Sequence, residues 1–211
     1  MNETSGPGSP PRRVIDLDAL GTAKAYFFMI SAIVPRPIAW VTTRGRDGST
    51  NLAPFSFFQG VCAAPPTLMI SISSGKRSGE PKDTLANIRE TGEFVVNVLP
   101  HELVDPMVAS SAERPYGDSE IEAEGLETFP ADLVAPPCLA GSPINMECRL
   151  HQEVPIGQCV AVFGRIVRVH AREDVLDARD TVDPDKLRPW ARMGGAFYQP
   201  YGGVVRKNRP T

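Results

Sequence analysis

Three apolar, β-prone segments lie close together between residues 35 and 73, and no other part of the chain constrains the fold as much. They cover residues 38–43, 52–62 and 68–72, with turn-rich spacers between them. The first spacer contains Asp47-Gly48, which is a strong short-range signal for a β-hairpin. This stretch therefore predicts three strands in an antiparallel meander.

A proline interrupts the second of these segments. Pro54 follows Asn51, Leu52 and Ala53 in a run that otherwise reads as a central strand. Proline has no N–H to donate to a neighbouring strand, so it is confined to sheet edges, strand starts and bulges. The run therefore predicts either a bulge or an edge strand that faces a ligand.

The meander is also rich in hydroxyl and amide side chains. Sheets accept threonine readily, and asparagine or serine near a turn often bonds its own backbone, so ordinary structural roles are one interpretation. A polar wall for a bound ligand is the other. The residues concerned are Thr42, Thr43, Asn51, Ser56, Ser71 and Ser73.

The rest of the chain supports a β-rich domain. Residues 94–99, 144–154 and 159–170 read as further strands, and residues 82–92 as a short helix. Proline accounts for 21 of 211 residues, about twice its usual share, which favours turns and short strands. Six or more strands and few helices predict an antiparallel barrel. We expect one domain over residues 14–211, preceded by a flexible arm of residues 1–13.

Composition narrows the classes of function. The net charge is −3 and Lys and Arg are scattered, so no basic face indicates nucleic acid. No apolar run approaches the roughly 20 residues of a membrane span, and the first residues lack the apolar core of a signal peptide. We therefore expect a cytoplasmic protein without a membrane partner.

The cysteines and histidines show no metal-binding pattern. Cys62, Cys138, Cys148 and Cys159 lack CxxC spacing, and each lies in or beside an apolar segment. Such positions suit small, reduced, buried thiols. The three histidines lie far apart, without the spacing of metal ligands, so no metal site is predicted.

A cationic, hydroxyl-bearing loop precedes the predicted helix. A helix N-terminus presents free N–H groups and a favourable dipole to an anion, while Lys and Thr add charge and a directed donor. We expect a phosphate site here, with Asp83 or Thr84 capping the helix and Gly92 ending it. An ordinary solvated loop is the alternative. The loop residues are Lys76, Arg77, Ser78, Lys82, Asp83 and Thr84.

Four motifs follow one another along the chain: PRPIAWVTT, NLAPFSFF, PPTLMISIS and KDTLANIRETGEFVVN. They extend from about residue 35 to residue 97, and a weaker likeness continues in the strands to residue 170 and in RMGGAFY. In this order the motifs resemble the flavin reductase-like members of the FMN-binding split-barrel family. The resemblance covers well over half of the chain, and four ordered motifs are far more specific than any one.

The resemblance implies a six-stranded antiparallel split β-barrel of Greek-key type with a few short flanking helices. It also implies a homodimer with one FMN, or alternatively FAD, in each of two sites at the subunit interface. The residues along the flavin ring and ribityl chain, largely through backbone groups, would be Trp40, Thr42 and Thr43. Those at the ring edge or the ribityl hydroxyls would be Asn51, Leu52, Ala53 and Ser56. Those at the phosphate would be Ser71, Ser73, Lys82, Asp83 and Thr84.

Two elements have open roles. Arg36 lies between two prolines, which hold its backbone extended. By resemblance, its side chain reaches either the phosphate or the ring. Residues 192–198 match an element that lies near the partner subunit's flavin in the family, and packing in the subunit interface is the alternative.

The function that the resemblance implies is that of an oxidoreductase. Bound FMN would accept a hydride from NAD(P)H and pass electrons to free flavin, ferric iron or a partner monooxygenase, so no catalytic acid, base or nucleophile is expected. An FMN-binding electron carrier without efficient NAD(P)H turnover is the alternative. No GxGxxG motif follows a predicted strand, so NAD(P)H would bind transiently over the flavin. The choice between NADH and NADPH stays open.

Overall fold

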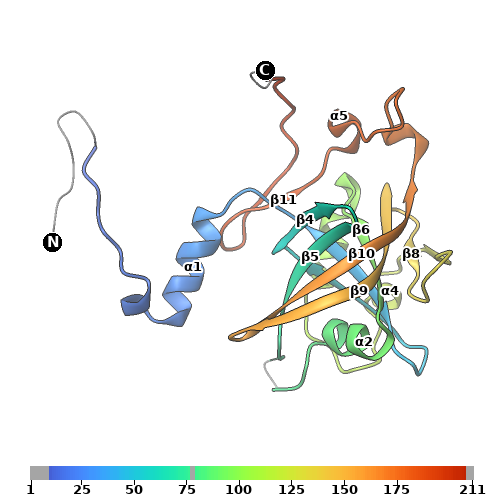
Figure 1. Cartoon of the computed structure of the whole chain (residues 1–211), viewed down its shortest axis with the longest axis horizontal. Helices are drawn as coiled ribbons and strands as arrows, with labels where there is room; N and C mark the ends of the chain where they lie inside the picture. The colour runs from blue at the N-terminus through green and yellow to red at the C-terminus, as the bar shows by residue number, and fades with distance from the viewer. Residues whose placement is uncertain (1–9, 77–78, 208–211) are drawn as a thin grey trace.

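The computed structural model describes residues 10–76 and 79–207, and within these ranges the fold is mainly β (Figure 1). Seven antiparallel strands form one sheet in the order β3-β2-β6-β9-β10-β5-β4, and their inward faces enclose an apolar core. The strands are β2 (Ala39–Arg44), β3 (Thr50–Phe55), β4 (Phe58–Ala63), β5 (Pro66–Ser73), β6 (Glu93–Val98), β9 (Ile144–Ile156) and β10 (Cys159–Ala171). The predicted class, an antiparallel split barrel with short helices, is confirmed.

The strand count differs because the apolar run at residues 52–62 is two strands, not one. The chain bends at Ser56 and Phe57, so that β3 pairs with β2 while β4 pairs with β5. The two halves of the run then lie at opposite edges of the sheet. The predicted three-stranded meander is therefore wrong, although the hairpin between β2 and β3 forms at Asp47-Gly48 as expected, with Gly48 at φ 90.

Strand β3 is an edge strand, which is one of the two arrangements that Pro54 predicts. The N–H of Leu52 points away from β2 and donates to the carboxylate of Glu120 at 2.9 Å. Alternate residues of a strand turn their N–H groups to the same side, so Pro54 occupies a position where no ladder donor is needed. None of the described strands pairs with the outer side of β3.

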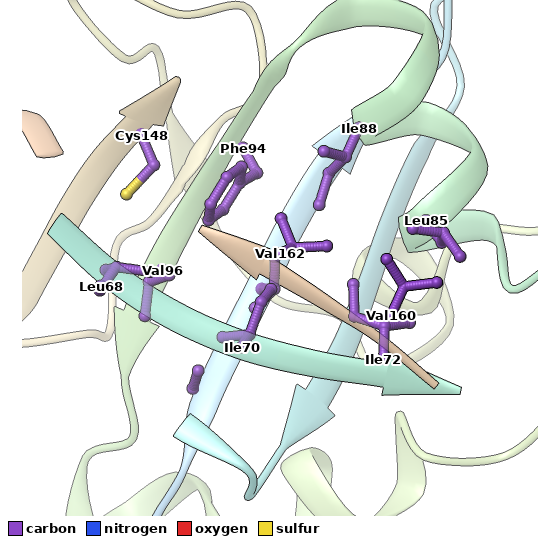
Figure 2. Packing of buried hydrophobic residues seen from close by; sticks show 12 residues of the cluster. Leu68, Ile70, Ile72, Leu85, Ile88, Phe94, Val96, Cys148, Val160 and Val162 are labelled. Atoms are coloured by element: carbon purple, nitrogen blue, oxygen red, sulfur yellow. The ribbon is translucent and has the colours of Figure 1, made fainter. Parts of the chain in front are cut away.

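The barrel core forms where alternating apolar residues of several strands meet (Figure 2). Leu68, Ile70 and Ile72 on β5 point inward, while Ser71 and Ser73, which alternate with them, lie on the outer face. The close packing leaves no room at Gly164 on β10, because a Cβ there would lie 2.3 Å from the ring of Phe94. This alternation fixes which side of each strand is available to a ligand.

Helix α2 (Asp83–Thr91) closes one end of the barrel. Leu85 and Ile88 on one side of the helix reach the core, as Figure 2 shows. The helix ends at Gly92, which adopts the left-handed conformation with φ 73, as predicted. The predicted cap is wrong: Lys82 occupies the N-cap position, and neither Asp83 nor Thr84 caps the helix with its side chain.

Shorter elements surround the barrel. Strand β1 (Arg36–Pro37) pairs with β11 (Ala191–Arg192), which pairs with β12 (Tyr198–Gln199), so the C-terminal segment returns to the Pro35 region. The others are η1 (Asp18–Leu20), η2 (His101–Leu103), α3 (Val104–Ala109), α4 (Glu120–Ala123), β7 (Thr128–Phe129), β8 (Cys138–Leu139), η3 (Glu173–Val175) and α5 (Pro184–Leu187).

Helix α1 (Thr22–Ala32) projects to one side of the barrel (Figure 1). Only Ile30 of this helix is buried, whereas Tyr26, Phe27 and Phe28 are 48%, 57% and 44% exposed. Phe197 of the C-terminal segment is 74% exposed. A helix with this many exposed aromatic side chains has an apolar surface that residues 10–76 and 79–207 leave uncovered.

The thiols follow the prediction in part. All four cysteines are free, and Cys138 and Cys148 are buried, but Cys62 on β4 is exposed and does not belong to the core. Burial raises the pKa of Cys138 to about 12. Among the described helices, none combines the length and the apolar character that crossing a bilayer requires.

Candidate functional site

Two pockets adjoin one another along the outer side of β3. Their volumes are about 220 and 190 Å³. We call the first the lysine pocket; it is lined by Asn51, Ala53, Pro54, Phe55, Ser73, Lys76, Lys82, Asp83, Thr84, Ser110, Ser111, Ala112, Glu113, Arg114 and Glu120. We call the second the arginine pocket; it is lined by Tyr26, Ile30, Arg36, Ile38, Pro54, Phe55, Ser56, Met107, Ser111, Arg192 and Tyr198. Three residues line both, so the pockets form one groove.

Each cation of the lysine pocket has an acidic partner. Lys76 Nζ lies 2.7 Å from Asp83 Oδ1, and both side chains are nearly buried. Lys82 Nζ lies 3.2 Å from Glu113 Oε1 at the more exposed rim. The guanidinium of Arg114 approaches Glu124 at 3.5 Å. The cations are therefore held in place, with their charges largely compensated.

The start of α2 brings further donors to the lysine pocket. Among the described residues no side chain caps this end of the helix, so the N–H groups of its first turn have no capping acceptor there, and Lys82, Asp83 and Thr84 all line the pocket. Thr84 Oγ1 accepts a hydrogen bond of 2.9 Å from Asn51 Nδ2, which links the helix to β3. Uncapped N–H groups, hydroxyls and ammonium groups together suit a phosphate.

Glu120, at the start of α4, lies behind the lysine pocket and is only 5% exposed. Burial raises the pKa of this carboxyl, the N–H of Leu52 partly offsets the effect, and the nearby charge of Asp83 adds to it while Arg114 opposes it. The hydrogen bond from the N–H of Leu52 to the carboxylate of Glu120 fixes the outer edge of β3. The sequence analysis missed Glu120, because it lies in an acidic, turn-rich segment without a motif.

Arg36 anchors the arginine pocket. Its Nη1 donates to the carbonyls of Ile30 at 2.5 Å and Ile33 at 2.7 Å, and its Nη2 donates to the carbonyl of Met193 at 3.0 Å. Its Nε contacts Ser56 Oγ at 3.4 Å. One side chain thus joins the end of α1, the bend after β3 and the C-terminal segment. Burial lowers the pKa of Arg36, and the positive charge of Arg192 lowers it further.

Arg192 lies on the other side of the same pocket. Its guanidinium stacks over the ring of Tyr198, 4.3 Å from the ring centre, and its Nη2 donates to the carbonyl of Gly195 at 2.6 Å. Strand pairing of β1 with β11 places Arg192 opposite Arg36. The C-terminal segment that matched the family motif therefore lies at the groove.

Some residues of the expected site lie beneath the groove and do not line it. Trp40 is fully buried and donates from Nε1 to Ser110 Oγ at 2.9 Å. Thr42 Oγ1 donates to the carbonyl of Pro137 at 2.6 Å, and Thr43 Oγ1 accepts from Asn87 Nδ2 at 3.1 Å. Leu52 is also fully buried, and Ser71 lies on the outer face of β5. These side chains line neither pocket but support β3 and its neighbours.

The expected site residues therefore fall into three groups. The lysine pocket brings together Asn51, Ala53, Ser73, Lys82, Asp83 and Thr84, and also the loop residue Lys76. The arginine pocket brings together Arg36 and Ser56. Arg77 and Ser78 lie outside the described residues. Trp40, Thr42, Thr43, Leu52 and Ser71 form the supporting layer, and their contact with a cofactor stays a prediction.

A separate polar cluster lies away from the groove. Glu147 is fully buried on β9, and its carboxylate accepts from the N–H groups of Asp132 at 2.9 Å and Leu133 at 2.7 Å and contacts His170 Nε2 at 2.6 Å. Burial alone would raise the pKa of Glu147, but these contacts outweigh it and lower the pKa. Although Asp132, Glu147 and His170 come within 4.8 Å of one another, these bonds already account for the buried carboxylate.

The outer side of β3 thus carries a phosphate-suited pocket at one end and an aromatic, cationic pocket at the other, an arrangement that suits a nucleotide cofactor. The comparisons with known proteins point in the same direction. The family model described as "Flavin reductase like domain" matches residues 30–190. The chain therefore belongs to the flavin reductase-like family.

Named relatives come from several bacteria. The chain is 29% identical to the flavin reductase (NADH) of Kitasatospora aureofaciens over 79% of this chain and 78% of that protein. The structure of nitrilotriacetate monooxygenase component B from Bacillus cereus superposes with a TM-score of 0.89 at 30% identity, covering 94% of this chain and all of the other. The 2-nitrobenzoate 2-nitroreductase of Pseudomonas fluorescens gives 0.86 at 32% identity, covering 94% and 97%.

Proposed function

We propose that this protein is an FMN-dependent oxidoreductase that takes a hydride from NAD(P)H. The observation that carries the proposal is the continuous groove along β3, which offers uncapped helix N–H groups, lysines and hydroxyls at one end and aromatic and cationic side chains at the other. Membership of the flavin reductase-like family supports the same cofactor.

The length and polarity of the groove suit FMN in one direction. Residues 51–56 run from the lysine pocket to the arginine pocket, and at about 3.4 Å per residue they span roughly 17 Å. The phosphate belongs at Lys82, Thr84 and Ser73, and the ribityl chain beside Asn51 and Ala53. The ring then points toward the arginine pocket. Trp40, Thr42, Thr43, Leu52 and Ser71 act on this site through the strands that they stabilise.

FMN, when bound, supplies the hydride and electron chemistry. The chain supplies position and charge. Glu120 and the Asn51–Thr84 bond hold β3 and α2 in register, so the donors for the phosphate stay fixed. Arg36 and Arg192 create a positive potential at the opposite end, where an electron-rich ring or an anionic substrate is stabilised.

For the electron acceptor we propose classes of compound or partner. Free flavin and ferric iron are two candidates, and a partner oxygenase is the third, since one similar structure is a component of nitrilotriacetate monooxygenase. Another similar structure is a 2-nitrobenzoate 2-nitroreductase, which makes an aromatic acid a fourth candidate. NADH is named for the relative from Kitasatospora, and this protein could use NADH or NADPH.

We also propose a homodimer with the flavin site at the subunit interface. The exposed aromatic side chains of α1 and Phe197 provide an apolar surface of the kind that a second copy covers. Tyr26 of α1 lines the arginine pocket, so a copy that packs on this helix would lie beside the groove. Sedimentation should then give twice the mass of one chain, and Phe27→Asp with Phe197→Asp should give one.

The test of the proposed function has two steps. The purified protein should be yellow, or should bind added FMN with quenching of its fluorescence. Anaerobic addition of NADH or NADPH should then bleach the flavin absorbance within the turnover time of a reductase. Bleaching that is slow or absent with both nucleotides would identify an electron carrier instead, and failure to bind FMN would remove the whole proposal.

A further inference from the structure

The arginine pocket has a positive charge that nothing in its lining compensates. Arg36 and Arg192 both line it, and no Asp or Glu is among its lining residues, all of which belong to the described part of the chain. Two guanidinium groups held close together repel each other, and an anion between or beside them relieves that repulsion. The pocket therefore favours an anionic ligand over a neutral one of the same shape.

The two arginines differ in the donors that they can offer. A guanidinium has five N–H groups, and Arg36 uses four of them on Ser56 and on three main-chain carbonyls. Arg192 uses one, on Gly195, and has no other acceptor among residues 10–76 and 79–207. Its guanidinium lies over the ring of Tyr198, which limits its movement. Arg192 therefore keeps N–H donors for an anion, and a guanidinium can bind a carboxylate through two of them.

The volume and walls of the pocket limit the rest of the ligand. The pocket is open on one side and has a volume of about 190 Å³, and a cavity of about 150 Å³ is known to hold one benzene molecule. Most of its lining surface is polar, and Ile30, Ile38, Phe55 and Met107 form an apolar wall on the remainder, against which a flat ring can pack. A single six-membered ring therefore fits this space beside the flavin ring.

We propose that the arginine pocket binds a monocyclic aromatic carboxylate, with the ring against the apolar wall and the carboxylate on Arg192. This inference rests on the proposed function, because the pocket continues the groove assigned to FMN and would place such an acid beside the flavin ring. It goes further in naming the chemical class of the second ligand and the residue that selects it.

Benzoate and benzamide form a matched pair of probes, since they share a ring and differ in charge. Calorimetric titration of the FMN-loaded protein should give at least tenfold tighter binding for benzoate. Arg192→Met should weaken benzoate binding at least tenfold and change benzamide binding less than twofold. Arg192→Lys, which keeps the charge but not the bidentate geometry, should fall between them. Arg165→Met, on the exposed surface of β10 and outside both pockets, is the control.

The outcomes are separable. Equal affinity for benzoate and benzamide overturns the inference, as does a loss of both ligands in Arg192→Met with FMN affinity and melting temperature unchanged. A loss of NADH binding in that variant, without a preference for benzoate in the parent, assigns Arg192 to the nucleotide phosphates and also overturns it. The FMN titration, made first on the same preparations, shows independently whether the proposed function fails.

Discussion

The two halves of the groove handle charge in opposite ways. In the lysine pocket, Lys76, Lys82 and Arg114 each have a carboxylate partner within 3.5 Å. In the arginine pocket, Arg36 and Arg192 have no acidic neighbour among the lining residues that the structure describes. A ligand at the first end must exchange with existing ion pairs, whereas a ligand at the second end meets open positive charge. Ligand binding in the lysine pocket therefore depends on geometry, and ligand binding in the arginine pocket depends on electrostatics.

The largest effect is expected at Arg36, because this side chain holds three segments together. Arg36→Met removes four hydrogen bonds, three of them to main-chain carbonyls, of which that of Ile30 is buried. We expect the free energy of unfolding to fall by about 3 kcal/mol. Urea denaturation measures this loss, and hydrogen exchange should show faster opening of residues 30–36 and 190–198.

The control for this prediction is Arg165→Met, whose side chain is exposed and makes no hydrogen bond with the described residues. Its unfolding free energy should match that of the parent within about 0.5 kcal/mol. If Arg36→Met also left the free energy of unfolding unchanged, the arginine pocket would not depend on the hydrogen bonds of Arg36. The contrast between the two pockets would then lose its structural basis.

The next effect concerns the lysine pocket and its ligand. Lys82→Ala with Thr84→Ala removes an ammonium and a hydroxyl at the start of α2, so FMN affinity should fall roughly 30- to 100-fold, or about 2–3 kcal/mol. Fluorescence titration measures the dissociation constant. Riboflavin, which has no phosphate, should bind parent and variant alike.

A matched variant lies at the other end of the same helix. Arg89→Ala with Thr91→Ala also removes one cation and one hydroxyl from α2, but Arg89 pairs with Glu153 at 2.9 Å and neither residue lines the groove. FMN affinity should change less than twofold. Equal losses in the two double variants would mean that the helix as a whole, and not its start, determines binding.

Much of the fold could be predicted because its signals are local. Alternating apolar residues, Asp47-Gly48, Pro54 and Gly92 each act within a few residues, and each marks a strand, a turn, an edge or a helix end where the structure has one. The break at Ser56 was missed because residues 52–62 stay apolar and β-prone across it. The separation of β3 from β4 follows from pairing with distant partners, which no local pattern records.

The residues of the candidate site also divide into those with a local sequence signal and those without one. Lys82, Thr84 and Asn51 could be predicted because motif and loop chemistry coincide there. Glu120 and the position of Arg192 opposite Arg36 could not, since both depend on segments brought back to the groove from 68 and 156 residues away. Contacts at such separations arise from the topology of the barrel and leave no spacing in the sequence.

Glu120, the buried carboxylate behind the lysine pocket, makes the stability of the protein dependent on pH. Because the folded-state pKa of Glu120 is raised, its contribution to stability is complete below the ordinary Glu pKa of about 4.3 and is lost as the pH rises through the folded-state pKa. Glu120→Gln keeps an acceptor for Leu52 without the buried charge. Its unfolding free energy should exceed that of the parent at pH 7 and converge with it near pH 4. Exposed Glu122→Gln, on the same helix, should show no such pH dependence.

The smallest effect tests whether the ion pairs of the lysine pocket compete with a ligand. Glu113→Gln removes the charge opposite Lys82, a partly exposed pair that contributes only a few tenths of a kcal/mol to about 1 kcal/mol. Lys82 is then available to a phosphate without exchange, so FMN should bind about threefold more tightly while riboflavin binding stays constant. Glu153→Gln breaks a pair of similar exposure outside the groove and should leave both affinities unchanged. Unchanged FMN affinity in Glu113→Gln would show that Lys82 keeps its acidic partner when the ligand is bound. The ion pair would then help to position the lysine and would not oppose the phosphate.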